Sequence, residues 1–189
     1  MNPAMKLKVC GVNDAAFAVA AEAAGVDYLG FIFHPKSPRN VTAEQARAIT
    51  ATLSGRARRV GVFVSQTPDE IVRICRAAGL QVVQLHRRAS EADVAMLRAA
   101  GFEVWTLAGG AVGDGLLFDS SHGDGETAFR RGAYKSILAG RIGVDNLADA
   151  RAAGPDVLDV NSSLETAPGV KSSARLRDLL AALGKFHLA

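Results

Sequence analysis

KLKVCGVND, residues 6–14, joins a short apolar strand pattern to a polar strand end, a glycine and a helix cap. The strand ends at Cys10, and Asn13 or Asp14 can cap the alanine-rich helix expected over residues 15–24. The same order of strand, polar residue, glycine and helix returns along the chain. The stretch therefore predicts a fold that repeats one strand–helix unit.

Seven further strands are expected after the first. Each is short and mostly apolar, as strands buried on both faces of a parallel sheet are. They cover residues 26–33, 59–64, 82–85, 103–107, 116–118, 135–139 and 157–160. Helices are expected from caps at Thr42, Thr67 and Ser90, and over residues 144–153 and 172–183.

The alternation of strands and helices is interrupted after the fifth strand. Residues 108–115 are too few and too rich in glycine for a helix, so this helix is expected to be reduced to a loop. After the sixth strand we expect at most a short helix near residues 127–131.

Eight strands that alternate with helices predict a parallel sheet with right-handed crossovers. Eight is also the number that closes into a barrel filled by its own side chains. We therefore predict a (β/α)8 TIM barrel, with residues 1–189 as one domain. An open doubly wound sheet is the alternative, but residues 10–13 lack its glycine-rich nucleotide turn.

Composition and charge limit the partners and the location expected for this protein. The 189 residues carry a net charge of +3, with arginines scattered and without a long basic run, so nucleic acid is not an expected partner. No apolar run approaches the roughly 20 residues that span a bilayer, and the first residues lack a signal-peptide pattern. Two cysteines do not suggest a disulfide framework. We expect a cytoplasmic protein that does not bind membranes.

The active site of such a barrel lies at the carboxyl ends of its strands. Cys10 and Asp119 end the first and sixth strands, and a thiol and a carboxyl group facing one pocket suit base and acid roles. Alternatively, Cys10 is a small hydrophobic strand end and Asp119 a helix cap. The other polar or glycine positions at strand ends are His34, His86, Gly140 and residues 161–163.

Residues 138–146 (LAGRIGVDN) and 159–165 (DVNSSLE) offer small residues and backbone N–H groups after the last two strands. Barrels of this kind often bind phosphate there, although ordinary loop chemistry also accounts for either segment. Arg39 follows two prolines at the barrel mouth, where it either binds a carboxylate bidentately or is a solvated charge. The histidines fit no zinc spacing, so no metal is expected.

Several segments match one known family. They are KVCGV (8–12), DYLGFIFHPKSPR (27–39), VGVFV (60–64), VVQLH (82–86), FDS (118–120), LAGRIGVDN (138–146) and DVNSSLETAPGVK (159–171). The chain thereby resembles the phosphoribosylanthranilate isomerases of tryptophan biosynthesis. That resemblance implies an Amadori rearrangement of N-(5'-phosphoribosyl)anthranilate, without cofactor or metal, by a monomer or homodimer.

The resemblance also assigns roles to residues. Asp119 is expected to be the general acid that opens the sugar ring, and Cys10 the base that removes the C2′ proton. Arg39 is expected near the anthranilate carboxylate. From its own position at a strand end, and not from the resemblance, His86 is expected to contact the substrate, with a surface residue as the alternative. Gly140, Asn161 and Ser162 fall on the phosphate-binding loops.

The chain departs from the family pattern at several positions, among them the loss of a tryptophan usual after the sixth strand. Arg141 stands where a second glycine is usual, Arg87 replaces another glycine, and Glu126 replaces a lysine. These changes keep two alternatives open: a related barrel isomerase or epimerase for another sugar phosphate, and a non-catalytic barrel that binds a phosphorylated ligand. Retention of Cys10 and Asp119 argues against the second.

Overall fold

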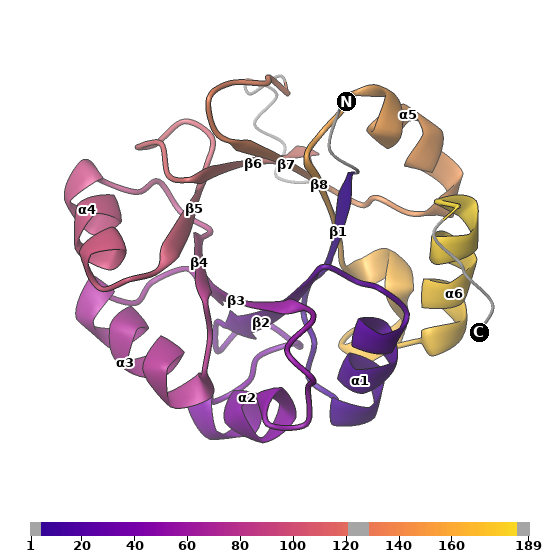
Figure 1. Ribbon diagram of the computed structural model, residues 1–189, viewed down its shortest axis with the longest axis horizontal. Coiled ribbons are helices and arrows are strands. Elements are labelled where there is room, and N and C mark those ends of the chain that lie inside the picture. Colours follow the sequence, from indigo (N-terminus) through magenta and orange to yellow (C-terminus); the bar gives the residue numbers. More distant parts are fainter. Residues whose placement is uncertain (1–4, 121–128, 185–189) are drawn as a thin grey trace.

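The computed structural model describes residues 5–120 and 129–184. Eight parallel strands form a closed barrel in sequence order, seen end-on in Figure 1. The predicted TIM barrel is therefore confirmed. The strands are β1 (Lys6–Val9), β2 (Tyr28–Phe33), β3 (Arg58–Phe63), β4 (Val82–Leu85), β5 (Glu103–Leu107), β6 (Gly115–Asp119), β7 (Lys135–Ala139) and β8 (Val157–Val160).

Helices surround the barrel (Figure 1). Their N-termini follow the predicted local signals: Thr42, Thr67 and Ser90 each form a capping box. Asp14, and not Asn13, caps the first helix by accepting a hydrogen bond from the Phe17 N–H at 2.7 Å. The helices are α1 (Ala15–Ala23), α2 (Ala43–Thr50), α3 (Pro68–Ala78), α4 (Glu91–Ala99), α5 (Leu147–Ala152) and α6 (Ser173–Ala182).

The connection from β5 to β6 has no helix, as predicted, because residues 108–114 form turns and irregular backbone. The short helix expected near residues 127–131 is only partly covered by the described residues. Residues 129–131 are in neither helix nor strand, and residues 127–128 lie outside the described ranges.

Two apolar clusters lie on opposite faces of the sheet. One fills the lower barrel interior with inward-facing side chains such as Tyr28, Trp105 and Ile137. The other packs the outward faces of the strands against the helices. Because apolar side chains close the interior below, open space is left at the carboxyl ends of the strands.

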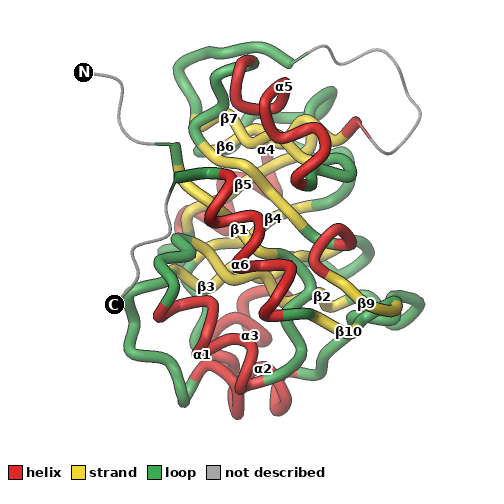
Figure 2. Tube along the Cα trace, turned by 90° about the vertical axis from the view of Figure 1, so that its right-hand side faces the viewer, coloured by secondary structure: helices red, strands yellow, loops and turns green. Residues whose placement is uncertain are grey.

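A hairpin that the sequence patterns did not predict follows β8 (Figure 2). It consists of β9 (Glu165–Ala167) and β10 (Val170–Lys171), and a short 310 helix, η3 (Ser162–Leu164), precedes it. The Asn13 side chain donates a hydrogen bond to the Gly169 carbonyl at 3.0 Å. A Cβ at Gly169 would lie 2.5 Å from the Pro38 carbonyl oxygen. The hairpin thus packs closely on the loop after β2.

None of the helices within the described ranges has the length and apolar character needed to cross a membrane.

Candidate active site

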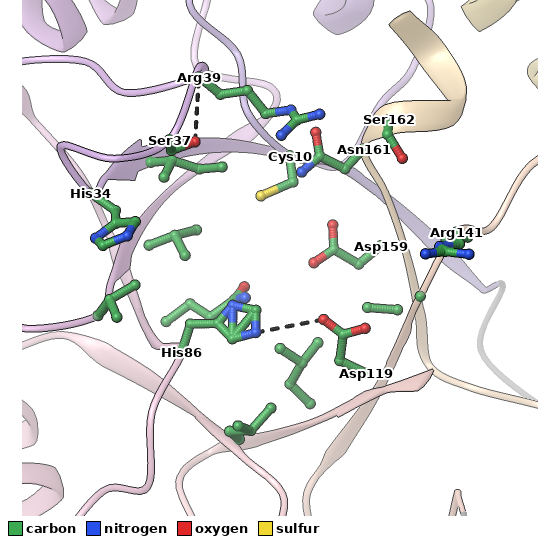
Figure 3. Close-up of a pocket in the computed structure, with 18 residues that line it drawn as sticks. Cys10, His34, Ser37, Arg39, His86, Asp119, Arg141, Asp159, Asn161 and Ser162 are labelled. Atoms are coloured by element: carbon green, nitrogen blue, oxygen red, sulfur yellow. Dashed lines mark hydrogen bonds and ion pairs between the residues drawn. The ribbon is translucent and has the colours of Figure 1, made fainter. Parts of the chain in front are cut away.

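A cavity of about 770 Å³ opens at the carboxyl ends of the strands (Figure 3). Every site residue predicted from the sequence lines it: Cys10, Arg39, His86, Asp119, Gly140, Asn161 and Ser162. Segments separated by more than 100 residues therefore meet in one space. The sequence patterns did not single out three further polar lining residues, Ser37, Gln84 and Asp159.

Cys10 directly follows β1, and its N–H donates to the Val160 carbonyl at 2.8 Å. The side chain is nearly buried, and Gly30 on the neighbouring strand leaves room for it. A Cβ at Gly30 would lie 3.1 Å from Sγ. Burial raises the pKa of the Cys10 thiol, although the ammonium groups of Lys8 and Lys171 act in the opposite direction. The protonated thiol is therefore favoured at neutral pH.

Below Cys10, Lys8 and Asp159 form a buried ion pair with an Nζ–Oδ2 distance of 2.6 Å. They are register partners on β1 and β8, so both side chains face the interior. Burial alone would lower the pKa of Lys8, but the Asp159 carboxylate outweighs it and the pKa is raised. The sequence contains a signal for this ion pair: each of two apolar strands carries one charged residue, and a buried charge requires a partner.

Asp119 is the last residue of β6, and its side chain extends into the cavity from a different side than Cys10 (Figure 3). Its Oδ2 lies 3.5 Å from Nε2 of His86, which follows β4. The His86 N–H donates to the Phe63 carbonyl at 2.8 Å, which fixes its backbone at the end of the barrel. A carboxyl group and an imidazole thus share one side of the cavity.

The guanidinium of Arg39 is already paired with a carboxylate of the protein, so it is not a solvated charge. Its Nε and Nη2 donate to the two carboxylate oxygens of Glu165 at 2.7 and 2.6 Å. The Arg39 N–H also donates to Ser37 Oγ at 3.1 Å (Figure 3). The bidentate carboxylate contact expected for this arginine is therefore made within the protein, by a residue of the hairpin. A guanidinium has five N–H donors, so its second edge remains for another acceptor.

The two loops expected to bind phosphate lie side by side. Ser163 Oγ donates to the Ile142 carbonyl at 2.5 Å and joins them. Gly140 has a φ of 112°, and a Cβ there would lie 2.0 Å from Ser120 Oγ, so a glycine is required beside the end of β6. The Gly143 N–H donates to Asn146 at 2.9 Å and is already engaged.

Arg141 is the one non-glycine residue in the described ranges with a positive φ, at 51°. It lines the cavity, its side chain is exposed, and the described part of the chain gives its guanidinium no carboxylate partner. The left-handed conformation costs an ordinary residue roughly 1 kcal/mol or more. A cation without a carboxylate partner among the described residues is thus held at the rim in a strained backbone conformation.

Within residues 5–120 and 129–184, no three His, Cys, Asp or Glu side chains are grouped so as to hold a metal ion. The site instead combines one buried thiol, carboxyl groups, imidazoles and cations. Such groups can move protons and bind anions.

A family model described as N-(5'phosphoribosyl)anthranilate (PRA) isomerase matches residues 7–108 and 107–182. The protein named N-(5'-phosphoribosyl)anthranilate isomerase in Acidiphilium cryptum is 36% identical, over 94% of this chain and 97% of its own length. The protein of the same name in Granulibacter bethesdensis is 33% identical, over 94% of this chain and 97% of its own.

Solved structures agree in fold. Phosphoribosyl anthranilate isomerase from Thermus thermophilus superposes with a TM-score of 0.84 at 34% identity, over 97% of this chain and 100% of its own. A phosphoribosyl anthranilate isomerase in complex with reduced 1-(o-carboxyphenylamino)-1-deoxyribulose 5-phosphate gives a TM-score of 0.83 at 25% identity. That match covers 95% of this chain and 99% of the other.

Proposed function

Since the chain belongs to the N-(5'-phosphoribosyl)anthranilate isomerase family, we propose that Cys10 and Asp119 perform the isomerisation at the mouth of its barrel. The reaction is the Amadori rearrangement of N-(5'-phosphoribosyl)anthranilate to 1-(o-carboxyphenylamino)-1-deoxyribulose 5-phosphate, a step of tryptophan biosynthesis. The observation that carries this assignment of roles is the convergence of one thiol and one carboxyl group, from β1 and β6, on a single cavity.

In the first step, Asp119 donates a proton to the furanose ring oxygen. The C1′–O bond breaks, and the nitrogen lone pair forms the C=N bond of an iminium. Cys10 then removes the proton from C2′, and the electron pair moves toward nitrogen to give the enolamine. Loss of the hydroxyl proton at C2′ and protonation of C1′ complete the ketone. The iminium acidifies the C2′–H bond, so a modest base suffices.

The surroundings of Cys10 support its role as a base that acts in its thiolate form. The buried thiol is mostly protonated at rest, so it first loses its proton to solvent, and only the thiolate accepts the C2′ proton; the Lys8 ammonium below it stabilises that thiolate. Burial, and to a smaller extent the Asp159 carboxylate, keeps the pKa of Cys10 raised against the effect of the two lysines.

The two anionic ends of the substrate are assigned to the parts of the cavity that carry positive charge or N–H donors. The anthranilate carboxylate binds the second edge of the Arg39 guanidinium, and His86 contacts the sugar beside Asp119. The phosphate lies against the loops that carry Gly140, Asn161 and Ser162. The Gly143 N–H is engaged by Asn146, so other amides and the Arg141 guanidinium hold the phosphate. As part of the same proposal, the enzyme binds a phosphorylated small molecule and is located in the cytoplasm. Its assembly state is a monomer or a homodimer.

The test is complementation of a tryptophan auxotroph that lacks this isomerase, together with turnover of the purified chain. Growth and conversion by the wild type, both lost in a Cys10→Ala, Asp119→Asn double variant, are expected. A folded wild-type chain that neither restores growth nor converts the substrate would contradict the assignment. Conversion of a different aminoaldose phosphate would then support the related-isomerase alternative.

A further inference from the structure

We propose that Glu165 is a positioning residue that makes the enzyme selective for a substrate bearing a carboxylate on its aromatic ring, by fixing the orientation of Arg39. The inference rests on the proposed function, because it concerns the same substrate. Glu165 is assigned no contact with the substrate. It acts through the guanidinium that it holds.

The contact between Glu165 and Arg39 uses one full edge of the guanidinium. Nε and Nη2 reach Oε1 and Oε2 at 2.7 and 2.6 Å, and the Glu165 side chain is only 4% exposed. A planar fork held at one edge has a defined plane and direction. The opposite edge, formed by Nη1 and the second hydrogen of Nη2, then presents two parallel donors. That is the geometry in which a second carboxylate binds bidentately.

Lys171 fixes Glu165 in turn. Its Nζ donates to Glu165 Oε1 at 2.8 Å, to Asn161 Oδ1 at 2.7 Å and to the Asn161 carbonyl at 3.0 Å. These three bonds use all three donors of an ammonium whose side chain is 1% exposed. Burial alone would raise the pKa of Glu165, but hydrogen bonds from Arg39 and Lys171 lower it to about 2. The carboxylate is therefore charged at every pH at which the enzyme would work.

Two glycines leave the space that this arrangement needs. A Cβ at Gly11 would lie 2.6 Å from Arg39 Cδ, so the arginine stem crosses the backbone directly beside Cys10. The hairpin that carries Glu165 and Lys171 approaches the arginine loop at Gly169, which has a φ of 83°. Arg39 is thus held near the base proposed for catalysis, with its aliphatic stem against Gly11 and its guanidinium on Glu165 of the hairpin.

This arrangement predicts how selectivity arises. An unfixed arginine would pair with a substrate carboxylate only after losing the freedom of its long side chain. Holding the fork in advance removes that cost for a carboxylated ring. It does nothing for a ring without the carboxylate. Glu165 should therefore contribute to discrimination between the two substrates, and not to the proton transfers.

The experiment compares N-(5'-phosphoribosyl)anthranilate with its analogue that lacks the carboxylate, N-(5'-phosphoribosyl)aniline. For Glu165→Gln we expect KM for the carboxylated substrate to rise about tenfold or more, as for a misplaced charge-assisted hydrogen bond, with kcat nearly unchanged. Turnover of the aniline analogue should change by less than about twofold. Glu165→Asp, which keeps the charge, should lose less of the preference than Glu165→Gln.

Glu103→Gln is the matched control. Glu103 is also ion-paired with two cations and has a pKa lowered to about 2, but it begins β5 at the opposite end of the barrel. It should leave the preference for the carboxylated substrate unchanged. Arg39→Lys should lose the preference, and adding Glu165→Gln to it should cost little more, because both changes remove one interaction.

Equal losses on both substrates in Glu165→Gln would overturn the inference, since they indicate a purely structural role. An unchanged preference in a folded Glu165→Gln variant would overturn it as well. Failure of the proposed function is distinguishable, because the wild-type chain would then convert neither substrate.

Discussion

The ammonium of Lys8 lies 2.6 Å from the carboxylate of Asp159 inside the barrel, directly below the thiol of Cys10. The two residues face each other across neighbouring strands, so the pair is a consequence of the register between β1 and β8. It places a cation next to the proposed base without leaving a buried charge unpaired. The ionisation of Cys10 should therefore depend on Lys8.

Lys8→Met should raise the pKa of Cys10 further, by about one unit or more, because a nearby cation that favours the thiolate is removed. Thiolate absorbance in the ultraviolet as a function of pH measures this directly. The alkaline rise of kcat/KM should move to higher pH by the same amount. Lys8→Met combined with Asp159→Asn is the control for folding, and it should raise the pKa less because the Asp159 carboxylate itself opposes ionisation. An unchanged titration in both variants would remove Lys8 from the mechanism.

Cys10→Ala and Asp119→Asn should each lower kcat by at least about a hundredfold, since general acids and bases contribute roughly 10²–10⁴. Circular dichroism should show an intact fold, because neither change removes apolar packing below the cavity. A folded variant with near wild-type turnover would show that the substituted residue does not transfer a proton.

Arg39→Lys should raise KM more than it lowers kcat. A lysine keeps the charge, but it cannot bind Glu165 and a substrate carboxylate each with a two-donor edge. Steady-state kinetics with the carboxylated substrate measures this split. An unchanged KM would place the anthranilate carboxylate elsewhere in the cavity.

Arg141→Gly should change stability and binding in opposite directions. Glycine adopts the φ of 51° without strain, so the melting temperature should rise. Loss of the Arg141 guanidinium should weaken inhibition by inorganic phosphate, and the difference from the wild type should shrink at high salt. Calorimetry and inhibition assays measure the two effects. Unaltered phosphate inhibition would show that the side chain points away from the bound anion.

Acid stability should depend on Glu103. Burial alone would raise its pKa, but hydrogen bonds from Lys135, Trp105 and Arg58 lower it from 4.5 to about 2. A depressed carboxylate pKa stabilises the fold above pH 4.5, and that stabilisation is lost as the pH falls toward 2. The free energy of unfolding by urea should therefore differ between wild type and Glu103→Gln near neutral pH, and the two should converge in acid. A difference independent of pH would contradict this origin.

Local signals were sufficient for the barrel and for the strand ends. Caps such as Thr42 and Thr67 satisfy backbone N–H groups within three residues of themselves. A short stretch of sequence is therefore enough to predict where the helix begins. Short apolar strands alternating with such helices admit few topologies, and the carboxyl ends of parallel strands must share one edge. The sequence alone therefore assigns Cys10 and Asp119 to one cavity.

Pairings across the barrel required the tertiary structure. Arg39 and Glu165 are separated by 126 residues, and Lys8 and Asp159 by 151. No local pattern specifies which charge lies opposite which, because that depends on strand register and on the path of a hairpin that lacks a strong strand signal. Burial likewise decides the protonation of Cys10, since the same thiol would ionise more readily in water. The residue types in this site follow from the sequence, whereas their partners and charges follow from the way the barrel closes.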